Sequence, residues 1–215
     1  MDILKEIHNK GHIVLDDILD SQTHEFIKYS MMQHGNWKFS SSTTQPKDYL
    51  KYLTPDSQII PKIFEAPQFT HSIFDNQVTN QVLYDATNII TSQIQKIFQY
   101  KFYIRPIQYK CNFQYSYNRP QNTLFNSPHI DFGDDIEVKP SFVTIIYYLN
   151  NTDGDTYLFN QLFNGEKFNK LDILTQISPK SGRCVIFPTN RMHTGGHPTQ
   201  DIRVLLNLNL QIIPI

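Results

Sequence analysis

The hydrophobic and polar positions divide the chain into two halves with different periods. After Asp75, apolar residues recur mostly at spacings of three and four, which predicts an amphipathic helix of about twenty residues. Its stripe comprises Val78, Val82, Leu83, Ala86, Ile89, Ile90, Ile94 and Ile97. A second predicted helix runs from Ser21, which can cap it, to Met32, with Phe26, Ile27 and Met31 on one face. Residues 37–67, rich in Ser, Thr, Pro and Tyr, predict irregular loop.

Beyond about Tyr100, short runs rich in Ile, Val, Phe and Tyr alternate with turn-forming residues. The runs are YIRPIQYKCNFQYSY, SFVTIIYYLN, DTYLFN, LDILTQI, RCVIFP and RVLLNLNLQII. Short strands at such spacing favour an antiparallel barrel or jelly roll over a parallel sheet with crossover helices. The sequence therefore predicts an α+β fold in a single domain, residues 1–215. Residues 1–99 are expected to be a helical elaboration packed on the sheet, and residues 100–215 a jelly-roll core, the cupin-like double-stranded β-helix.

Composition excludes several classes of protein. The 215 residues carry a formal charge of −1 without a block of Lys and Arg, which argues against a dedicated nucleic-acid binder. Cys111 and Cys184 match no C-x-x-C pattern and are expected to be reduced core thiols. No secretory signal opens the sequence, and no apolar run approaches the roughly 18 residues that span a bilayer. We expect a soluble cytoplasmic protein.

The last predicted strand, RVLLNLNL, carries polar residues on one face. Residues two apart share a face of a strand, so the apolar face is formed by Val204, Leu206, Leu208 and Leu210. The opposite face reads Arg203, Leu205, Asn207 and Asn209. These polar side chains need either solvent or buried partners. Two interpretations follow, an outer sheet face or a polar pocket inside the barrel that also includes Tyr148.

The segment NSPHIDFGDD suggests a metal site between two predicted strands. A lone His-X-Asp triplet is a weak signal, but His129 and Asp131 can point the same way and chelate one ion. His193 follows the strand RCVIFP and completes a 2-His-1-carboxylate set, which leaves three positions open on an octahedral Fe(II). His197 is the competing distal ligand. It stands six residues before Arg203 and precedes a proline, which is typical of a turn.

Those open positions suit a particular chemistry. A bidentate 2-oxo acid can fill two of them and dioxygen the third. The far carboxylate of such an acid needs a charged partner of fixed geometry, and an arginine offers a bidentate fork. Arg203 follows His193 by ten residues, on the next predicted strand.

Several segments together resemble the 2-oxoglutarate- and Fe(II)-dependent dioxygenases. They are KCNF, SPHIDF, IIYYLNNTDGDTYLF, CVIFPTNRMH and IRVLLNLNL, in the order typical of that family and within residues 110–211. The resemblance is to the prolyl-hydroxylase-like branch, and above all to the small oxygenases of bacteriophages, which would place the protein in a host cytoplasm. The sequence GDT stands where a GG-x-T turn is commoner in the family.

The resemblance implies a role for each candidate residue. It assigns metal binding to His129, Asp131 and His193, the C5 carboxylate of 2-oxoglutarate to Arg203 and Tyr148, and the cosubstrate or a metal-bound water to Asn207. Asp131 is replaced by a small residue in related halogenases, so its presence favours hydroxylation. The implied cofactors are Fe(II), 2-oxoglutarate and dioxygen, with ascorbate as a further candidate, and the products include succinate and carbon dioxide.

Other interpretations stay open at this stage. A catalytically silent jelly roll that retains a metal is the main alternative to an enzyme, and an oxygenase acting on nucleobases is a further one. Prolyl residues are the substrate suggested by analogy with the family, beside free amino acids, peptides and other small metabolites. Asp134, Asp135 and Glu137 read as a solvated loop that could also contact a cationic substrate. Trp37 and Tyr49 are expected to be core anchors. The sequence does not indicate an oligomeric state.

Overall fold

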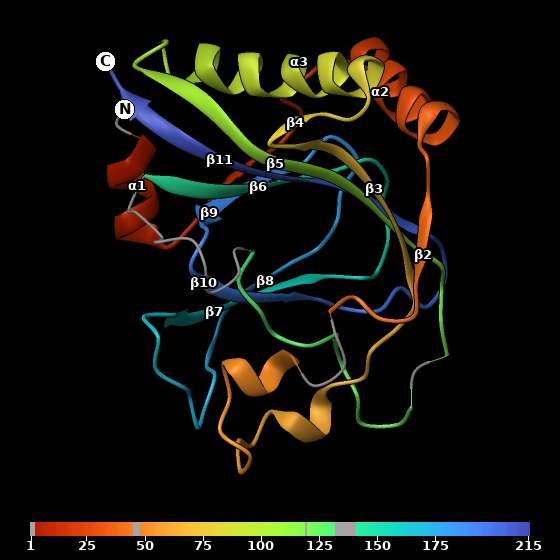
Figure 1. The fold of residues 1–215 in the computed structure, drawn as a ribbon, viewed down its shortest axis with the longest axis vertical. Helices are drawn as coiled ribbons and strands as arrows, with labels where there is room; N and C mark the ends of the chain where they lie inside the picture. Colours follow the sequence, from red (N-terminus) through yellow and green to blue (C-terminus); the bar gives the residue numbers. More distant parts are fainter. Residues whose placement is uncertain (1–2, 45–47, 119, 132–140) are drawn as a thin grey trace.

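Figure 1 shows the computed structural model, which describes residues 3–44, 48–118, 120–131 and 141–215. The described residues form three α-helices and two short 3-10 helices. These are α1 (Ile3–Lys10), α2 (Ser21–His34), α3 (Gln81–Ile97), η1 (Asp48–Lys51) and η2 (Ile60–Lys62). None of the helices in these ranges is long and apolar enough to cross a membrane.

The strands form a large and a small antiparallel sheet, which confirms the predicted jelly roll. The strands are β1 (Ile13–Leu15), β2 (Lys38–Ser40), β3 (Gln68–Asp75), β4 (Gln77–Val78), β5 (Phe102–Gln114), β6 (Phe142–Tyr148), β7 (Thr156–Leu162), β8 (Ile173–Ile177), β9 (Cys184–Pro188), β10 (Arg191–Gly195) and β11 (Arg203–Pro214). The large sheet has the order β1-β9-β6-β11-β5-β3-β2, and the small sheet the order β10-β7-β8. β11 pairs with β5 on one side and with β6 on the other.

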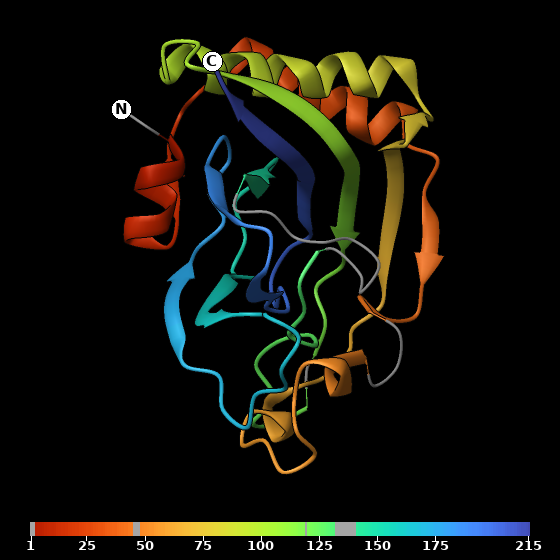
Figure 2. The same ribbon diagram turned by 60° about the vertical axis from the view of Figure 1, so that its left-hand side comes forward.

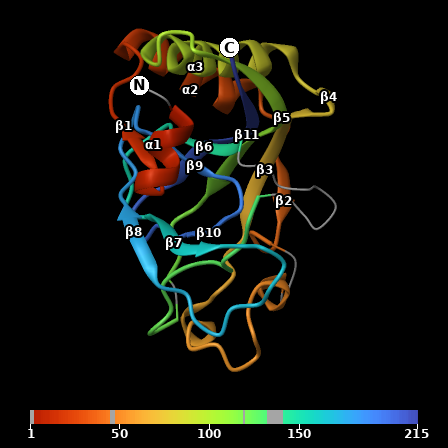
Figure 3. The same cartoon turned by 90° about the vertical axis from the view of Figure 1, so that its left-hand side faces the viewer.

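The apolar face of the large sheet is covered by helices. Leu206 and Leu208 of β11 belong to the same buried cluster as Ile90 and Ile94 of α3. Figure 2 shows α2 and α3 lying side by side across this end of the sheet, and Figure 3 shows α1 beside β9. Burying this apolar face removes it from water, which stabilises the fold by roughly 25 cal/mol for each Å² of apolar surface.

The other face of the large sheet points towards the small sheet. Ile146, Tyr148 and Leu205 of the large sheet pack with Leu158 and Ile177 of the small sheet. β6 is therefore buried on both sides. Arg203 and Asn207 of this inner face line a cavity inside the barrel, so the pocket interpretation is confirmed for these two residues and the outer-face interpretation is wrong. Tyr148 does not line this cavity.

The predicted helices exist, with corrections at their ends. Asp20, not Ser21, caps α2, because its carboxylate accepts the backbone N–H of Thr23 at 2.9 Å. Phe26 does not share the buried face of α2, since 54% of it is exposed. α3 begins at Gln81, and Val78 lies outside it in the short strand β4.

The first half of the chain also contributes strands, so its description as a helical elaboration is incomplete. β3 pairs with β5 and extends the large sheet beyond the predicted strands, and β2 pairs with β3 at the edge. In β3 the polar Thr70 and Ser72 alternate with Phe69, His71 and Ile73. This alternation matches a strand of which one face lines a polar cavity.

Candidate active site

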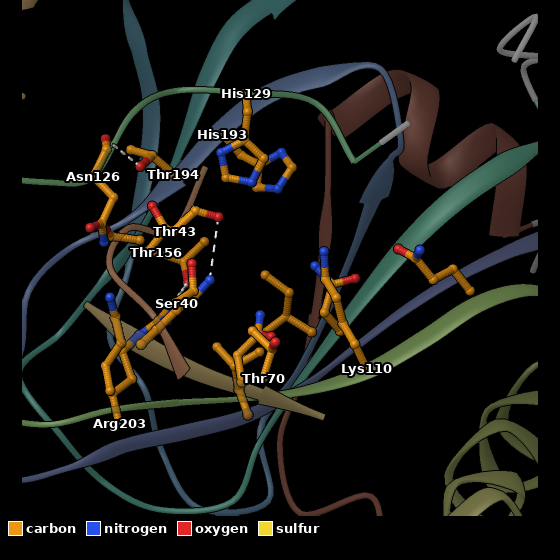
Figure 4. A pocket seen from close by; sticks show the side chains of 18 of the residues that line it. Ser40, Thr43, Thr70, Lys110, Asn126, His129, Thr156, His193, Thr194 and Arg203 are labelled. Carbon is orange, nitrogen blue, oxygen red and sulfur yellow. Dashed lines mark hydrogen bonds between the residues drawn. The ribbon is translucent and has the colours of Figure 1, made fainter. Parts of the chain in front are cut away.

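The three predicted metal ligands come together beside the barrel interior. The ligand atoms of His129, Asp131 and His193 all lie within 4.8 Å of one another. His129 pairs with His193 through two backbone hydrogen bonds of 2.9 and 3.0 Å, and the ring centroids are 4.6 Å apart. His193 thus lies on a strand, β10, which is not among the strands predicted from the sequence. Figure 4 shows the two imidazoles side by side above the cavity.

Both imidazoles are held in the tautomer that leaves Nε2 as the ligand. Nδ1 of His129 donates to the carbonyl of Ser127 at 2.9 Å, and Nδ1 of His193 donates to the carbonyl of Arg191 at 2.9 Å. Burial lowers the pKa of His193 to about 4, so its ring is neutral near pH 7. Its buried Nε2 has no hydrogen-bond partner among the described residues, as expected of an atom that coordinates a metal.

The carboxylate of Asp131 is oriented through both oxygens. Oδ1 accepts the side-chain N–H of Asn207 at 3.0 Å, and Oδ2 accepts the hydroxyl of Thr144 at 2.8 Å and lies 3.4 Å from Nε2 of His193. Burial alone would raise the pKa of Asp131, but its electrostatic interactions with His193, Lys110 and His129 and the Thr144 hydrogen bond lower it well below its usual range. Asp131 is therefore an anionic ligand at neutral pH.

The backbone just before His129 is anchored by two polar side chains, each of which bonds to a residue distant from it in the sequence. Glu65 accepts the backbone N–H of Ser127 at 2.6 Å and that of Thr43 at 3.0 Å. Asn126 accepts the N–H of Ala66 and donates to the carbonyl of Gly195, which lies at the end of β10. These bonds fix the backbone just before His129. The ligand geometry therefore does not depend only on the backbone hydrogen bonds between His129 and His193.

Arg203 lies in the same cavity, on the inner face of β11. It is 8% exposed, and its guanidinium donates to two neutral groups, the carbonyl of Gly154 at 2.6 Å and the hydroxyl of Thr156 at 2.9 Å. Within the described part of the chain no carboxylate lies at salt-bridge distance from it, whereas Arg183 pairs with Asp16 at 2.7 Å. A buried guanidinium without an anion is costly, so a bound carboxylate is the expected partner.

The GDT turn, where the sequence departs from the commoner GG-x-T, helps to form the arginine site. A Cβ on Gly154 would come within 2.8 Å of Cδ of Arg203, and one on Gly195 within 3.2 Å of its Nη1. Thr156, two residues after Gly154, accepts hydrogen bonds from Arg203 and, at 2.6 Å, from the hydroxyl of Tyr148. Glycine at these two positions therefore leaves the space that the arginine side chain fills.

One cavity of about 340 Å³ joins the metal-ligand set to Arg203. Its lining includes His129, His193, Arg203 and Asn207, but not Tyr148, which is completely buried behind Thr156. The structure thus brings five of the predicted residues to the cavity or the ligand set, and places Tyr148 against a residue of the wall.

Sequence reasoning missed several polar residues of this site. They are Lys110, Asn112, Gln114, Thr144 and Thr156. A signal existed for the first three, because Lys, Asn and Gln alternate with Tyr109, Cys111 and Phe113 at the period of a strand.

The remaining candidates lie elsewhere. His197 is buried and packs edge-on against Phe64 with ring centroids 5.6 Å apart, and it is not part of the ligand set. Trp37 and Tyr49 are partly buried and pack against two apolar clusters, as core anchors do. The acidic group of Asp134, Asp135 and Glu137 lies outside the described residues.

The comparisons with known proteins support this arrangement. Residues 114–211 match the family described as the 2OG-Fe(II) oxygenase superfamily, a segment that contains the three ligands and Arg203. The match agrees with the resemblance predicted from the sequence and covers somewhat less than half of the chain. No curated protein matches the chain.

Solved structures confirm the fold. An oxidoreductase of the 2OG-Fe(II) oxygenase family from Burkholderia pseudomallei superposes with a TM-score of 0.64 at 11% identity, covering 97% of this chain and 89% of that one. A prolyl hydroxylase from Trichoplax adhaerens, solved with a peptide of hypoxia inducible factor, gives 0.60 at 14% identity and 97% and 87% coverage. The epimerase SnoN of nogalamycin biosynthesis superposes with a TM-score of 0.62 at 10% identity, covering 97% of this chain and 81% of that one. At such identities the likeness concerns the fold alone.

Proposed function

We propose that this chain, whose residues 114–211 match the 2OG-Fe(II) oxygenase superfamily, is an Fe(II)- and 2-oxoglutarate-dependent oxygenase. The observation that supports this most is the convergence in one cavity of a 2-His-1-carboxylate set and a buried arginine that has no carboxylate at salt-bridge distance among the described residues. A 2-oxo diacid can chelate an ion with one end and pair with a guanidinium at the other.

The residues at the metal end fit Fe(II) by their chemistry. Fe(II), when bound, supplies open positions at which the oxo acid and dioxygen are activated. His129 and His193 would present Nε2, and Asp131 would present Oδ2. Asn207 would act through Asp131, because its amide holds the other oxygen of that carboxylate.

The residues at the other end fit the far carboxylate of the cosubstrate. Arg203 would hold this carboxylate, and Thr156 and Tyr148 would fix the guanidinium and the cavity wall. Leu205 and Ile146 line the cavity between the two ends and exclude water from the middle of the cosubstrate.

For the reaction, we propose hydroxylation of a C–H bond, with release of succinate and carbon dioxide. The substrate class is an amino acid, free or within a peptide, and prolyl residues are the suggestion carried over from the prolyl hydroxylases among the similar structures. This step rests on analogy of fold.

The test compares two histidines under identical conditions. Wild-type protein with Fe(II) and 2-oxoglutarate, without oxygen, should give the weak visible charge-transfer band of the metal–cosubstrate complex, and with oxygen it should form succinate. His193→Ala should lose both signals while remaining folded, because the missing ligand lies beside the cavity. The matched variant His197→Ala should keep them. Metal binding without any 2-oxoglutarate signal in the wild type would support a silent jelly-roll module instead.

A further inference from the structure

The floor of the cavity extends from the metal-ligand set across two strands, and it is entirely polar. β5 contributes Gln108, Lys110, Asn112 and Gln114, and β3 contributes Thr70, Ser72 and Asp75. The register places Thr70 opposite Asn112 and Ser72 opposite Lys110, so these side chains form adjacent rows. The neighbouring residues Tyr109, Cys111 and Phe113 belong to the apolar core on the other face.

Several polar atoms of this floor have no hydrogen-bond partner among the described residues. Oδ1 of Asn112 and both polar atoms of the Gln114 side chain are buried and have no hydrogen-bond partner among the described residues. Gln114 is only 2% exposed. Buried polar groups are normally paired, so this surface is built for a polar ligand and not for an apolar one.

Lys110 is the cation of this floor nearest to the metal-ligand set. Its ammonium lies 3.6 Å from Oδ1 of Asp131, and 29% of its side chain is exposed. The other oxygen of Asp131 lies 3.4 Å from Nε2 of His193. The Asp131 carboxylate therefore lies between the ammonium and the metal-ligand histidine. This ion pair is longer than a hydrogen bond, so the three donors of the ammonium can serve a ligand in the cavity. In Figure 4, Lys110 and Arg203 lie on opposite sides of the space beneath the imidazoles.

Among the described residues, the buried charges of the cavity leave Lys110 in excess once the site is filled. The divalent ion and Arg203 carry three positive charges, and Asp131 and the cosubstrate dianion carry three negative charges. Lys110 adds a further positive charge. Asp75, the acidic residue among the described lining residues, lies opposite Gln108, three residues along β3 from Ser72, and is exposed, so solvent screens its charge. A substrate with one negative group near the reacting carbon restores the balance.

We infer that Lys110 binds the free carboxylate of the substrate, and that the substrate is a free amino acid instead of a residue inside a peptide. This inference rests on the proposed function and deepens it. An internal peptide residue is uncharged at its carbonyl and would leave Lys110 with Asp131, 3.6 Å away and shared with the metal-ligand set, as its anion. A free amino acid brings the carboxylate to Lys110 and hydrogen-bonding groups to Asn112, Ser72 and Thr70.

The experiment measures binding and turnover with matched probes. The twenty free L-amino acids, their α-carboxamides and an N-acetyl-prolyl amide are titrated by calorimetry into protein loaded with Mn(II) and 2-oxoglutarate under nitrogen. The same probes are tested for stimulation of succinate formation with Fe(II) and oxygen. The variants are Lys110→Gln and, as a control of equal charge change, Lys28→Gln on the exposed surface of α2.

At least one free amino acid should bind the wild type roughly 10- to 100-fold more tightly than its carboxamide, because one charge-assisted hydrogen bond is lost in the amide. Lys110→Gln should remove that difference and keep 2-oxoglutarate affinity and the charge-transfer band, whereas Lys28→Gln should change nothing. Equal affinity for acid and carboxamide, or binding of the blocked prolyl amide alone, overturns the inference. Loss of 2-oxoglutarate binding in Lys110→Gln also overturns it, since Lys110 would then only support Asp131. Absence of the charge-transfer band in the wild type would instead refute the proposed function.

Discussion

Replacing Arg203 with methionine should abolish 2-oxoglutarate binding and leave the cosubstrate-free protein folded. The guanidinium is buried in the cavity wall and hydrogen-bonds the carbonyl of Gly154 and the hydroxyl of Thr156. Methionine fills a similar volume without the charge and adapts to irregular packing. The substitution therefore separates the charge of this side chain from its bulk.

The magnitude follows from burial. A carboxylate left unpaired in a buried site costs about 3–5 kcal/mol, which is a loss of roughly 150- to 5,000-fold in affinity. In the cosubstrate-free protein the balance differs, because a buried charge without an anion is removed together with two hydrogen bonds that stabilise the fold by about 1–3 kcal/mol in total. Stability should change little or even rise. Arg203→Lys should bind with intermediate affinity, since it keeps the charge but loses the planar fork.

Calorimetry with Mn(II) in place of iron, under nitrogen, measures the affinity, and thermal unfolding with and without 2-oxoglutarate measures the stability. Arg183→Met is the control, because it removes an arginine whose ion pair with Asp16 lies at the surface. It should change stability by about 0–1 kcal/mol and leave the affinity unchanged. Wild-type affinity in Arg203→Met would refute the assignment of this end of the cavity to the cosubstrate carboxylate.

Two smaller effects should follow from the same structure. Tyr148→Phe and Thr156→Val each remove part of the hydrogen-bond chain that supports Arg203. Each should weaken 2-oxoglutarate binding by roughly tenfold. A loss of affinity larger than that of Arg203→Met would show that these two residues do not act through Arg203. His24 is buried against Tyr147 and Ser181, and desolvation lowers its pKa in the folded state. The unfolded chain therefore takes up the proton first, and denaturant unfolding should show stability falling as pH drops below about 6.5. His24→Gln should reduce that pH dependence, and an unchanged slope would exclude His24 as its source.

The ligand set could be predicted from the sequence because its signals are local. His129 and Asp131 are two residues apart in a segment flanked by strands, and β11 alternates polar and apolar residues along its length. A polar inner face in a strand whose other face is apolar indicates a polar cavity, and Arg203 and Asn207 were found in this way. At these positions, residue types that can bind a metal or an anion recur at the two-residue period of a strand.

The supporting residues escaped prediction because their partners are distant in sequence. Glu65 lies 62 residues from Ser127, whose N–H it accepts, and no local pattern links them. β10, with the sequence RMHTG, lacks a run of β-branched residues, and its pairing with β7 makes it a strand. The alternation along β5 groups Lys110 with the polar residues, but its cross-strand partners depend on the register of β5 between β11 and β3, which the sequence of β5 alone does not specify.

The alternation along β11 has a geometric consequence under the proposed function. Arg203 and Asn207 are four residues apart on one face, and a strand rises about 3.3 Å per residue, so their Cα atoms are roughly 13 Å apart. A chain of five carbons with bonds of about 1.5 Å zigzags at each carbon and spans roughly 5 Å between its end carbons. The guanidinium covers the remaining distance at one end, and Asp131 with the ion covers it at the other. A shift of either residue by two positions would change the separation by about 7 Å, more than the length of the cosubstrate. One strand therefore sets both the polarity of the cavity and the length of the diacid that fits between Arg203 and the metal ligands.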